Sequence, residues 1–308
     1  MKYSVILPVY NEEENLSTLY DRVSDALKKL KCDYELIFVN DGSRDHTPEL
    51  LNKLHSKDKS VKIINFSRNF GHQTAVTAGL QHCSGDYIAI MDADLQDPPE
   101  ILAQFFAKLD DDYDVVYAIR TKRKESYLKR MGYDTFYRFL HFIANIDIPL
   151  DSGDFCVMNK KVVAALNSLP ERNRFVRGLR SWVGFKQIGI EYERASRHAG
   201  ESKYPISKLF KLAFDGIFSF SYVPLQMMFI VGFIAINLSI LATIWVVYQR
   251  FFTENYAQVP GFATTVILVT FIGGVQLFSL GVVGEYMKRM FDEIKQRPQY
   301  IIDSTSGF

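Results

Sequence analysis

The segment YIAIMDADLQDPP, residues 87–99, decides the fold that we predict for this chain. Its first five residues form an apolar run, which is typical of a strand buried on both faces of a sheet. The run ends at Asp92 and Asp94, and two carboxylates two positions apart at a strand end can contact one hard divalent cation. An Asp-x-Asp triplet alone is a weak signal, because such triplets are common in loops. Its position directly after a buried strand strengthens it, so the segment predicts a buried strand that leads into a candidate metal site.

Further apolar runs of strand length alternate with helical patterns along the first half of the chain. We predict strands at 3–9, 34–40, 61–66, 86–91 and 114–119, and helices after Asn11 and at 45–55, 71–82 and 99–108. Strands separated by helical stretches form right-handed βαβ units, in which neighbouring strands run parallel. The predicted fold class is therefore α/β, with a Rossmann-like and mainly parallel sheet.

Polar residues follow the carboxyl ends of four of these strands, at 8–12, 40–43, 66–69 and 92–97. In an open α/β sheet, ligands bind beyond the carboxyl ends of the strands, so the four segments predict one shared site. None of them contains GxGxxG or GxxxxGK[ST]. The usual dinucleotide site and a P-loop ATPase are therefore disfavoured.

Two runs in the last third of the chain, 223–248 and 262–284, contain no Asp, Glu, Lys or Arg. Each is long enough to cross a hydrocarbon core of ~30 Å, which takes ~20 helical residues. A buried helix of a soluble core is the alternative, and two successive runs joined by the polar segment 249–260 make it less favourable. Basic residues lie on both outer flanks, at Lys203, Lys208 and Lys211 and at Lys288, Arg289, Lys295 and Arg297. We therefore expect a transmembrane hairpin with both flanks in the cytoplasm.

Residues 205–222 place apolar side chains at helical spacing, which predicts an amphipathic helix at the membrane interface or against the soluble domain. The features together divide the chain into a catalytic-type domain at 1–204, an interfacial helix at 205–222, a transmembrane hairpin at 223–287 and a cytoplasmic C-terminal tail at 288–308. The hairpin contains no GxxxG pattern, so a homo-oligomer is neither predicted nor excluded.

Charge and cysteine usage exclude other classes of protein. Lys and Arg total 36 against 35 Asp and Glu, which gives a net charge of +1 and argues against a nucleic-acid partner. Cys32, Cys83 and Cys156 are far apart and have no metal-ligand spacing, and the six histidines form no HxH or HExxH pattern. Met1 leads directly into the first predicted strand without a visible signal peptide, so we expect the N-terminal domain to stay in the cytoplasm.

Several motifs carry a resemblance to a known family. They are ILPVYNEE (6–13), VNDGS (39–43), SRNFG (67–71), DADLQDPP (92–99), SGDF (152–155) and RHAGESKY (197–204). The set resembles family 2 glycosyltransferases of the GT-A fold, and within them the polyprenyl-phosphate glycosyltransferases, such as dolichol-phosphate mannose synthases and bacterial glucosyl and aminoarabinosyl relatives. The resemblance covers nearly the whole chain, including the two apolar runs.

This resemblance implies an inverting enzyme of the inner membrane that transfers a hexose from a nucleotide diphosphate sugar to a polyprenyl phosphate, such as undecaprenyl phosphate. The product would be a polyprenyl-phosphate sugar for cell-envelope glycosylation. UDP-glucose is the favoured donor, and other UDP-hexoses, GDP-mannose and UDP-aminoarabinose stay open. A polysaccharide synthase is disfavoured, because the chain has no QxxRW motif and comes nearest to it at 180–182. A non-catalytic module that binds nucleotide sugar or lipid is the second alternative.

The donor-site residues follow from matching the motifs position by position. The resemblance assigns Pro8, Tyr10, Glu12 and Asp41 to the nucleotide, Asp92 and Ala93 to the ribose and diphosphate, and Asp94 and Gln96, with Asp92, to Mg²⁺ or Mn²⁺. Each residue also has a purely structural alternative. Pro8 and Tyr10 could merely shape a turn, Asp41 could be a turn former or helix cap, and Gln96 could be a solvated loop residue.

The acceptor-site residues follow in the same way. Arg120, Arg197 and Lys203 would contact phosphates of donor or acceptor, and Asp154 matches the residue usually proposed as catalytic base. Arg120 could instead be a surface cation, and the juxtamembrane pair could attract only bulk anionic lipid. A phosphate monoester is mostly a dianion at pH 7, because its second pKa is about 6. We therefore expect Asp154 to orient the acceptor or stabilise the sugar ring more than to remove a proton.

Overall fold

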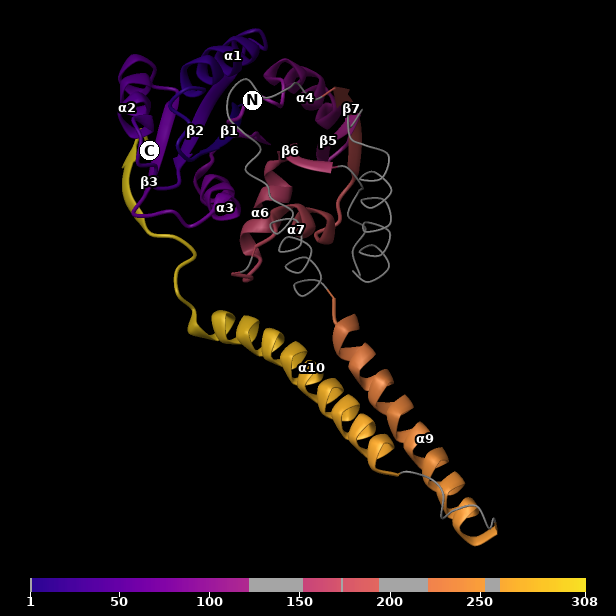
Figure 1. The fold of residues 1–308 in the computed structure, drawn as a ribbon. Coiled ribbons are helices and arrows are strands. Elements are labelled where there is room, and N and C mark those ends of the chain that lie inside the picture. The colour runs from indigo at the N-terminus through magenta and orange to yellow at the C-terminus, as the bar shows by residue number, and fades with distance from the viewer. Residues whose placement is uncertain (1, 122–151, 173, 194–220, 253–260) are drawn as a thin grey trace. The chain divides into compact units, whose positions relative to one another are not determined.

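The computed structural model describes residues 2–121, 152–172, 174–193, 221–252 and 261–308. The chain divides into two units, one of Met1–Leu212 with Gln296–Phe308 and one of Ala213–Lys295. The first unit is built on an eight-stranded sheet and the second contains two long helices (Figure 1).

The sheet has the strand order β7-β5-β6-β4-β1-β2-β3-β8. Its strands are β1 (Lys2–Val9), β2 (Asp33–Asn40), β3 (Val61–Phe66), β4 (Tyr87–Ile90), β5 (Val115–Thr121), β6 (Ser152–Asn159), β7 (Gln187–Glu193) and β8 (Ile302–Ser306). The pairs β1–β2, β1–β4, β2–β3 and β5–β7 are parallel, whereas β6 is antiparallel to β4 and β5, and β8 to β3. The prediction of an α/β fold with a mainly parallel sheet is confirmed, and all five predicted strands are present.

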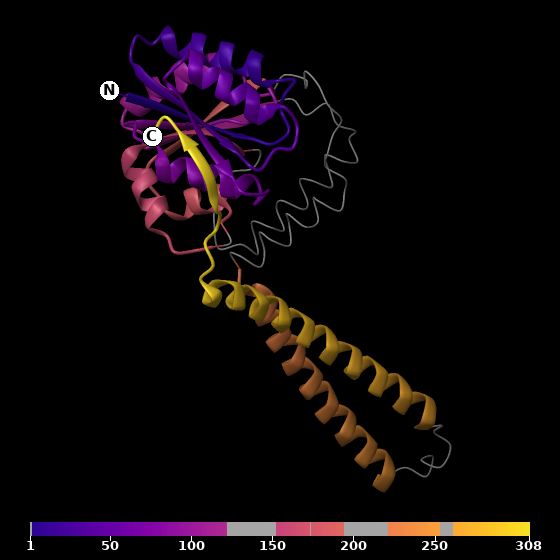
Figure 2. The same ribbon diagram turned by 90° about the vertical axis from the view of Figure 1, so that its left-hand side faces the viewer.

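Helices cover both faces of this sheet (Figure 1, Figure 2). On one face lie α1 (Leu16–Lys28), α2 (Thr47–Lys57) and α4 (Leu102–Asp110), which follows the short 3-10 helix η1 (Pro99–Ile101). On the other lie α3 (His72–His82), α6 (Lys160–Ser168) and α7 (Val176–Trp182). Helix α1 shows why these segments fold as they do, since its apolar side chains recur at helical spacing and are buried on the sheet. Full burial of one such side chain contributes about 1.5–3 kcal/mol.

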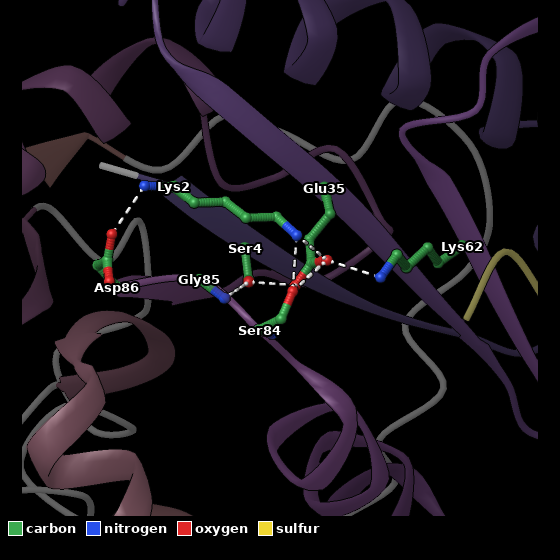
Figure 3. A network of polar contacts seen from close by, with 7 residues as sticks. All are labelled: Lys2, Ser4, Glu35, Lys62, Ser84, Gly85 and Asp86. Atoms are coloured by element: carbon green, nitrogen blue, oxygen red, sulfur yellow. Dashed lines mark hydrogen bonds and ion pairs between the residues drawn. The ribbon is translucent and has the colours of Figure 1, made fainter.

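The amino ends of the parallel strands are held together by one buried carboxylate, Glu35, which is 2% exposed (Figure 3). It accepts hydrogen bonds from Ser4 Oγ at 2.6 Å and from the Ser84 backbone N–H at 2.7 Å. Lys2 and Lys62 each place Nζ 2.9 Å from Glu35 Oε2. Burial alone would raise the pKa of Glu35, but these partners outweigh burial and lower the pKa to about 2.

The final strand, β8, is a feature that the sequence analysis does not predict. The tail 288–308 divides into the end of the preceding helix and this strand, which pairs with β3 at the edge of the sheet (Figure 2). The backbone N–H of Ser67 extends the pairing by donating to the carbonyl oxygen of Ile301 at 3.0 Å. The end of the chain therefore belongs to the unit that contains the first strand.

The second unit contains α9 (Val223–Phe252) and α10 (Gly261–Lys295). Within them, Val223–Trp245 and Leu268–Lys295 are long and apolar enough to cross a membrane. Only 0% and 6% of the most apolar windows are buried by protein, unlike the core helix of a soluble domain. Both predicted apolar runs are thus helical, whereas residues 205–220 of the predicted amphipathic helix lie outside the described residues.

Candidate active site

The predicted site lies at the carboxyl ends of β1, β2, β3 and β4, where the parallel pairing brings the polar segments to one edge of the sheet. Strand β6 runs in the opposite direction, so its amino end reaches the same edge and carries Asp154 there. The structure therefore brings Asp41, Asp92, Asp94 and Asp154 to one edge from three different segments.

Asp41 is clamped by the loop between β3 and α3. Its carboxylate, 3% exposed, accepts the backbone N–H groups of Phe70 at 2.6 Å and of Gly71 at 2.9 Å. Burial raises the pKa of Asp41, and the two backbone donors act against this rise. The adjoining Gly42 has φ of 67°, and a Cβ there would lie 2.5 Å from the backbone carbon of Arg68. Asp41 therefore holds two loops in close contact, which is more than the turn or helix cap that the sequence left open.

The loop after β1 is tied to the loop after β2. Asn11 has φ of 52°, its N–H donates to Ser43 Oγ at 3.0 Å, and its Oδ1 accepts the Arg44 N–H at 2.9 Å. Pro8 is buried within β1 opposite Val39, so it is a strand residue and does not shape a turn.

Glu12 and Tyr10, which are predicted to contact the nucleotide, differ in exposure and contacts. The backbone N–H of Glu12 donates to Thr47 Oγ1 at 3.0 Å, which is a second link between the two loops. Tyr10 is 40% exposed at the site edge, so its ring is accessible for stacking on a base.

The Asp92–Gln96 turn contains a carboxylate oxygen without a hydrogen bond among the described residues. Asp94 Oδ1 accepts the Gln96 N–H at 3.1 Å, Leu95 between them has φ of 60°, and Ala93 is buried. Asp92 Oδ1 is buried and has no hydrogen bond among the described residues, although His72 Nε2 lies 3.5 Å away. Burial raises the pKa of Asp92 to about 6, with His72 acting against the rise and Asp154 adding to it.

Such an orphaned carboxylate oxygen fits a divalent cation as its missing partner. Among the residues that the structure describes, no three His, Cys, Asp or Glu side chains form a group that could hold a metal ion on their own. A metal at Asp92 and Asp94 would therefore depend on oxygen atoms of a bound diphosphate, which is how Mg²⁺ is commonly held.

Asp154 lies among three side chains that the sequence analysis did not identify. Arg177 Nη2 lies 3.1 Å from its Oδ1, Gln73 Nε2 donates to its Oδ2 at 3.2 Å, and His72 Nε2 lies 3.6 Å from Oδ2. Burial would raise the pKa of Asp154, but the Arg177 guanidinium and His72 outweigh burial and hold the pKa far below its usual range. A carboxylate in this setting is a poor proton acceptor.

His72 connects the two halves of the site, because its Nε2 faces both Asp92 and Asp154. Partial burial of the ring opposes protonation, yet the two carboxylates and Asp41 raise the pKa of His72 to about 9. His72 and Gln73 directly follow the SRNFG segment, so extending that motif by two residues would have found them. No signal in the sequence links Arg177 to Asp154.

A buried arginine, Arg180, lines the same cavity as Asp154. Arg180 is 1% exposed, its Nε and Nη2 have no hydrogen-bond partner among the described residues, and it lines a cavity with Gln73, Asp154 and Arg177. The remaining predicted phosphate ligands are not placed, since the side chain of Arg120 and all of Arg197 and Lys203 lie outside the described part of the structure.

Comparisons with known proteins decide the family. The model of glycosyl transferase family 2 matches residues 4–166. The chain belongs to this family. It is 45% identical to "Uncharacterized glycosyltransferase YkcC" of Bacillus subtilis, covering 100% of this chain and 95% of that protein. It is 40% identical to "Uncharacterized glycosyltransferase sll0501" of Synechocystis sp., covering 100% and 96%. It is 39% identical to "SfII prophage-derived bactoprenol glucosyl transferase" of Shigella flexneri, covering 98% and 97%.

Membership of glycosyl transferase family 2 confirms the predicted GT-A fold and the prediction of an enzyme. The alternative of a non-catalytic module is therefore wrong. The matches to the three relatives extend through α9 and α10, so the apolar helices are part of the similarity and are not an addition to it.

Proposed function

We propose that this glycosyltransferase moves glucose from UDP-glucose to a polyprenyl phosphate, with inversion, at the cytoplasmic face of the cell membrane. The observation that carries the proposal is the similarity, over 98% of the chain, to a protein named bactoprenol glucosyl transferase. The site agrees with such a reaction, because Asp92, after β4, and Asp154, on β6, both face His72 Nε2.

The donor side is formed by the clamped Asp41, the exposed Tyr10 ring and the Asp92–Gln96 turn. Asp41 would accept hydrogen bonds from the base, and Ala93 would line the ribose. Asp94 and Gln96, with the orphaned oxygen of Asp92, would hold Mg²⁺ or Mn²⁺ against the diphosphate. The metal would neutralise charge on the departing diphosphate.

The acceptor side is formed by Asp154 and its cationic neighbours. A phosphate oxygen attacks the anomeric carbon, the bond from that carbon to the diphosphate oxygen breaks, and its electron pair leaves with UDP. The acceptor phosphate is already a dianion at pH 7, so no base is required. Asp154, held ionised by Arg177 and His72, orients the acceptor and stabilises the positive sugar ring.

The charge of the acceptor must also be offset, because two anions meet in this reaction. Arg177 lies beside Asp154 and is the described cation best placed for this task. Arg120, Arg197 and Lys203 remain predicted phosphate ligands, with a planar guanidinium or a point charge to offer.

The connectivity of the chain supports the proposed topology. The segments before and after Ala213–Lys295 belong to one unit. If α9 and α10 each cross the membrane once, the chain therefore enters and leaves the membrane on the same side. Basic residues at Lys288, Arg289 and Lys295 favour the cytoplasm for that side. Two crossing helices are few for a sugar-polymer channel, which disfavours a polysaccharide synthase.

A reconstitution assay tests the proposed function. The full chain in vesicles with undecaprenyl phosphate is given a panel of nucleotide sugars, and nucleoside diphosphate release is measured together with labelled lipid. We expect glucose transfer from UDP-glucose that needs both the lipid phosphate and a divalent cation. Transfer from another nucleotide sugar would correct the proposed donor. Release of nucleoside diphosphate without lipid phosphate would reject the proposed acceptor.

A substitution tests the role of Asp154. Asp154→Asn removes its charge and is expected to lower turnover on the order of 100-fold or more while UDP affinity stays unchanged. Near-normal turnover with intact donor binding would contradict both roles given to Asp154.

A further inference from the structure

The strand that follows the membrane hairpin reaches the donor side of the site. Strand β8 runs antiparallel to β3, with Ile302 opposite Phe66 and Ser306 opposite Ile63. The residues just before β8 therefore lie beside the carboxyl end of β3, at the edge where the nucleotide is expected (Figure 2). Asn65 Nδ2 donates to Ser304 Oγ at 3.1 Å, which adds a side-chain link to the backbone pairing.

Aromatic contacts continue from this strand into the first unit's loops. The ring of Tyr300 stacks on Phe66 with centroids 4.9 Å apart and planes 19° apart. Phe66 in turn meets the edge of Phe70 at 5.7 Å, and the Arg68 guanidinium lies 4.1 Å from the Phe70 ring centre. The hydroxyl of Tyr300 is fixed by Gln81 Oε1 on α3.

Phe70 is one of the two residues whose backbone N–H groups hold the Asp41 carboxylate. The ring of Phe70 and the N–H that Asp41 accepts belong to one residue, so a shift of the ring changes the position of this donor. The contacts thus form a short path from Tyr300 through Phe66 and Phe70 to Asp41.

We propose that Tyr300 is a positioning residue of the donor site, which acts through Phe66 and Phe70 on Asp41. This inference rests on the proposed role of Asp41 as a nucleotide ligand. The donor site of this chain is then complete only when the segment beyond the membrane hairpin has returned to the sheet. The alternative is that β8 merely covers the exposed edge of β3, as edge strands are often covered.

The test compares variants of the full chain in detergent by the affinity for UDP with Mg²⁺ and by the KM for the nucleotide sugar. Tyr300→Ala removes the stacked ring, and a buried aromatic pair contributes ~0.5–1.5 kcal/mol, so UDP affinity should fall about 2- to 12-fold. The turnover number and the KM for the lipid phosphate should stay unchanged. Tyr300→Phe keeps the ring and should retain the UDP affinity of the unmodified chain.

Asp303→Ala is the matched control, because Asp303 lies exposed on β8, a few residues after Tyr300. It should leave UDP affinity unchanged. If Tyr300→Ala lowers only the melting temperature, with UDP affinity intact well below that temperature, the strand is an edge cover and the inference is wrong.

A double-mutant cycle separates this inference from the proposed function. Asp41→Asn alone should weaken UDP binding, and adding Tyr300→Ala should then cause no further loss. If Asp41→Asn has no effect on UDP binding, the proposed role of Asp41 fails. If Asp41→Asn weakens binding and the two effects simply multiply, Asp41 keeps its role and the path from Tyr300 is rejected.

Discussion

Two acidic groups at opposite ends of the parallel strands, Glu35 and Asp92, have opposite surroundings. At the amino ends, Glu35 has hydroxyl, backbone and ammonium partners, and its pKa is lowered to about 2 (Figure 3). At the carboxyl ends, Asp92 keeps an oxygen without a hydrogen bond among the described residues, and its pKa is raised to about 6. Glu35 has close hydrogen-bond and ammonium partners, whereas Asp92 Oδ1 has only the more distant His72 Nε2, at 3.5 Å, among the described residues.

This contrast separates stability from function. A buried charge that is fully paired stabilises the folded state, whereas a buried polar atom without a partner costs free energy until something binds it. The amino ends should therefore carry a larger share of the unfolding free energy, and the carboxyl ends should carry the chemistry.

The largest effect is expected for Asp92→Asn. Removal of the charge should lower turnover by roughly 100- to 1,000-fold, the scale of losing one electrostatic group in a transition state. The melting temperature should change little, since Asp92 Oδ1 has no hydrogen bond among the described residues. Turnover and thermal unfolding are measured on one preparation, and a large drop in melting temperature would show that Asp92 is also a structural group.

Glu35→Gln should lower the unfolding free energy and leave turnover unchanged, which is the reverse of the result expected for Asp92→Asn. The shift from 4.5 to about 2 corresponds to about 3 kcal/mol of unfolding free energy at pH 7, at 1.36 kcal/mol for each pH unit. Turnover per folded molecule should not change, because Glu35 lies at the opposite edge from the site. Asp33→Asn, an exposed position on the same strand, is the control and should leave stability unchanged. An unaltered melting temperature in Glu35→Gln would contradict this account.

Acid titration gives a third comparison. Glu35 has a lowered pKa in the folded state, so its contribution is complete above about 4.5, the ordinary value, and is lost as pH falls toward about 2. Between pH 4.5 and pH 3 the loss should reach about 2 kcal/mol. The unfolding free energies of the unmodified chain and of Glu35→Gln should therefore converge as pH falls across this range. Parallel curves for the two chains would reject the assignment to Glu35.

The sequence predicted those parts of the molecule that depend on local pattern. The apolar runs of β1 to β4 and the polar residues after them predicted a site at the carboxyl edge, because parallel strands end at the same edge of a sheet. Strand β8, with the sequence IDSTS, was not predicted because it is short, polar and mostly exposed. It is a strand because its backbone pairs with that of β3.

The contacts around Asp154 were missed for a different reason. Strand β6 was known only as the SGDF motif, and its antiparallel place between β4 and β5 brings Asp154 to the site. Arg177 reaches Asp154 from α7, at a separation of 23 positions in the chain. Pairing of this kind is decided by packing, so it has no local signature that a single sequence could show.

The smallest expected effect concerns the divalent cation itself. If the orphaned oxygen of Asp92 awaits a metal, Mg²⁺ with UDP should raise the melting temperature of the unmodified chain. Ligands at tenfold their dissociation constant stabilise by about 1.4 kcal/mol, a modest but measurable shift. The same addition should stabilise Glu35→Gln equally, because that substitution leaves the carboxyl edge intact. It should not stabilise Asp94→Asn, which lacks a predicted ligand. Equal stabilisation of all three chains would place the cation away from the Asp92–Gln96 turn, and the unpaired oxygen of Asp92 would then need another partner.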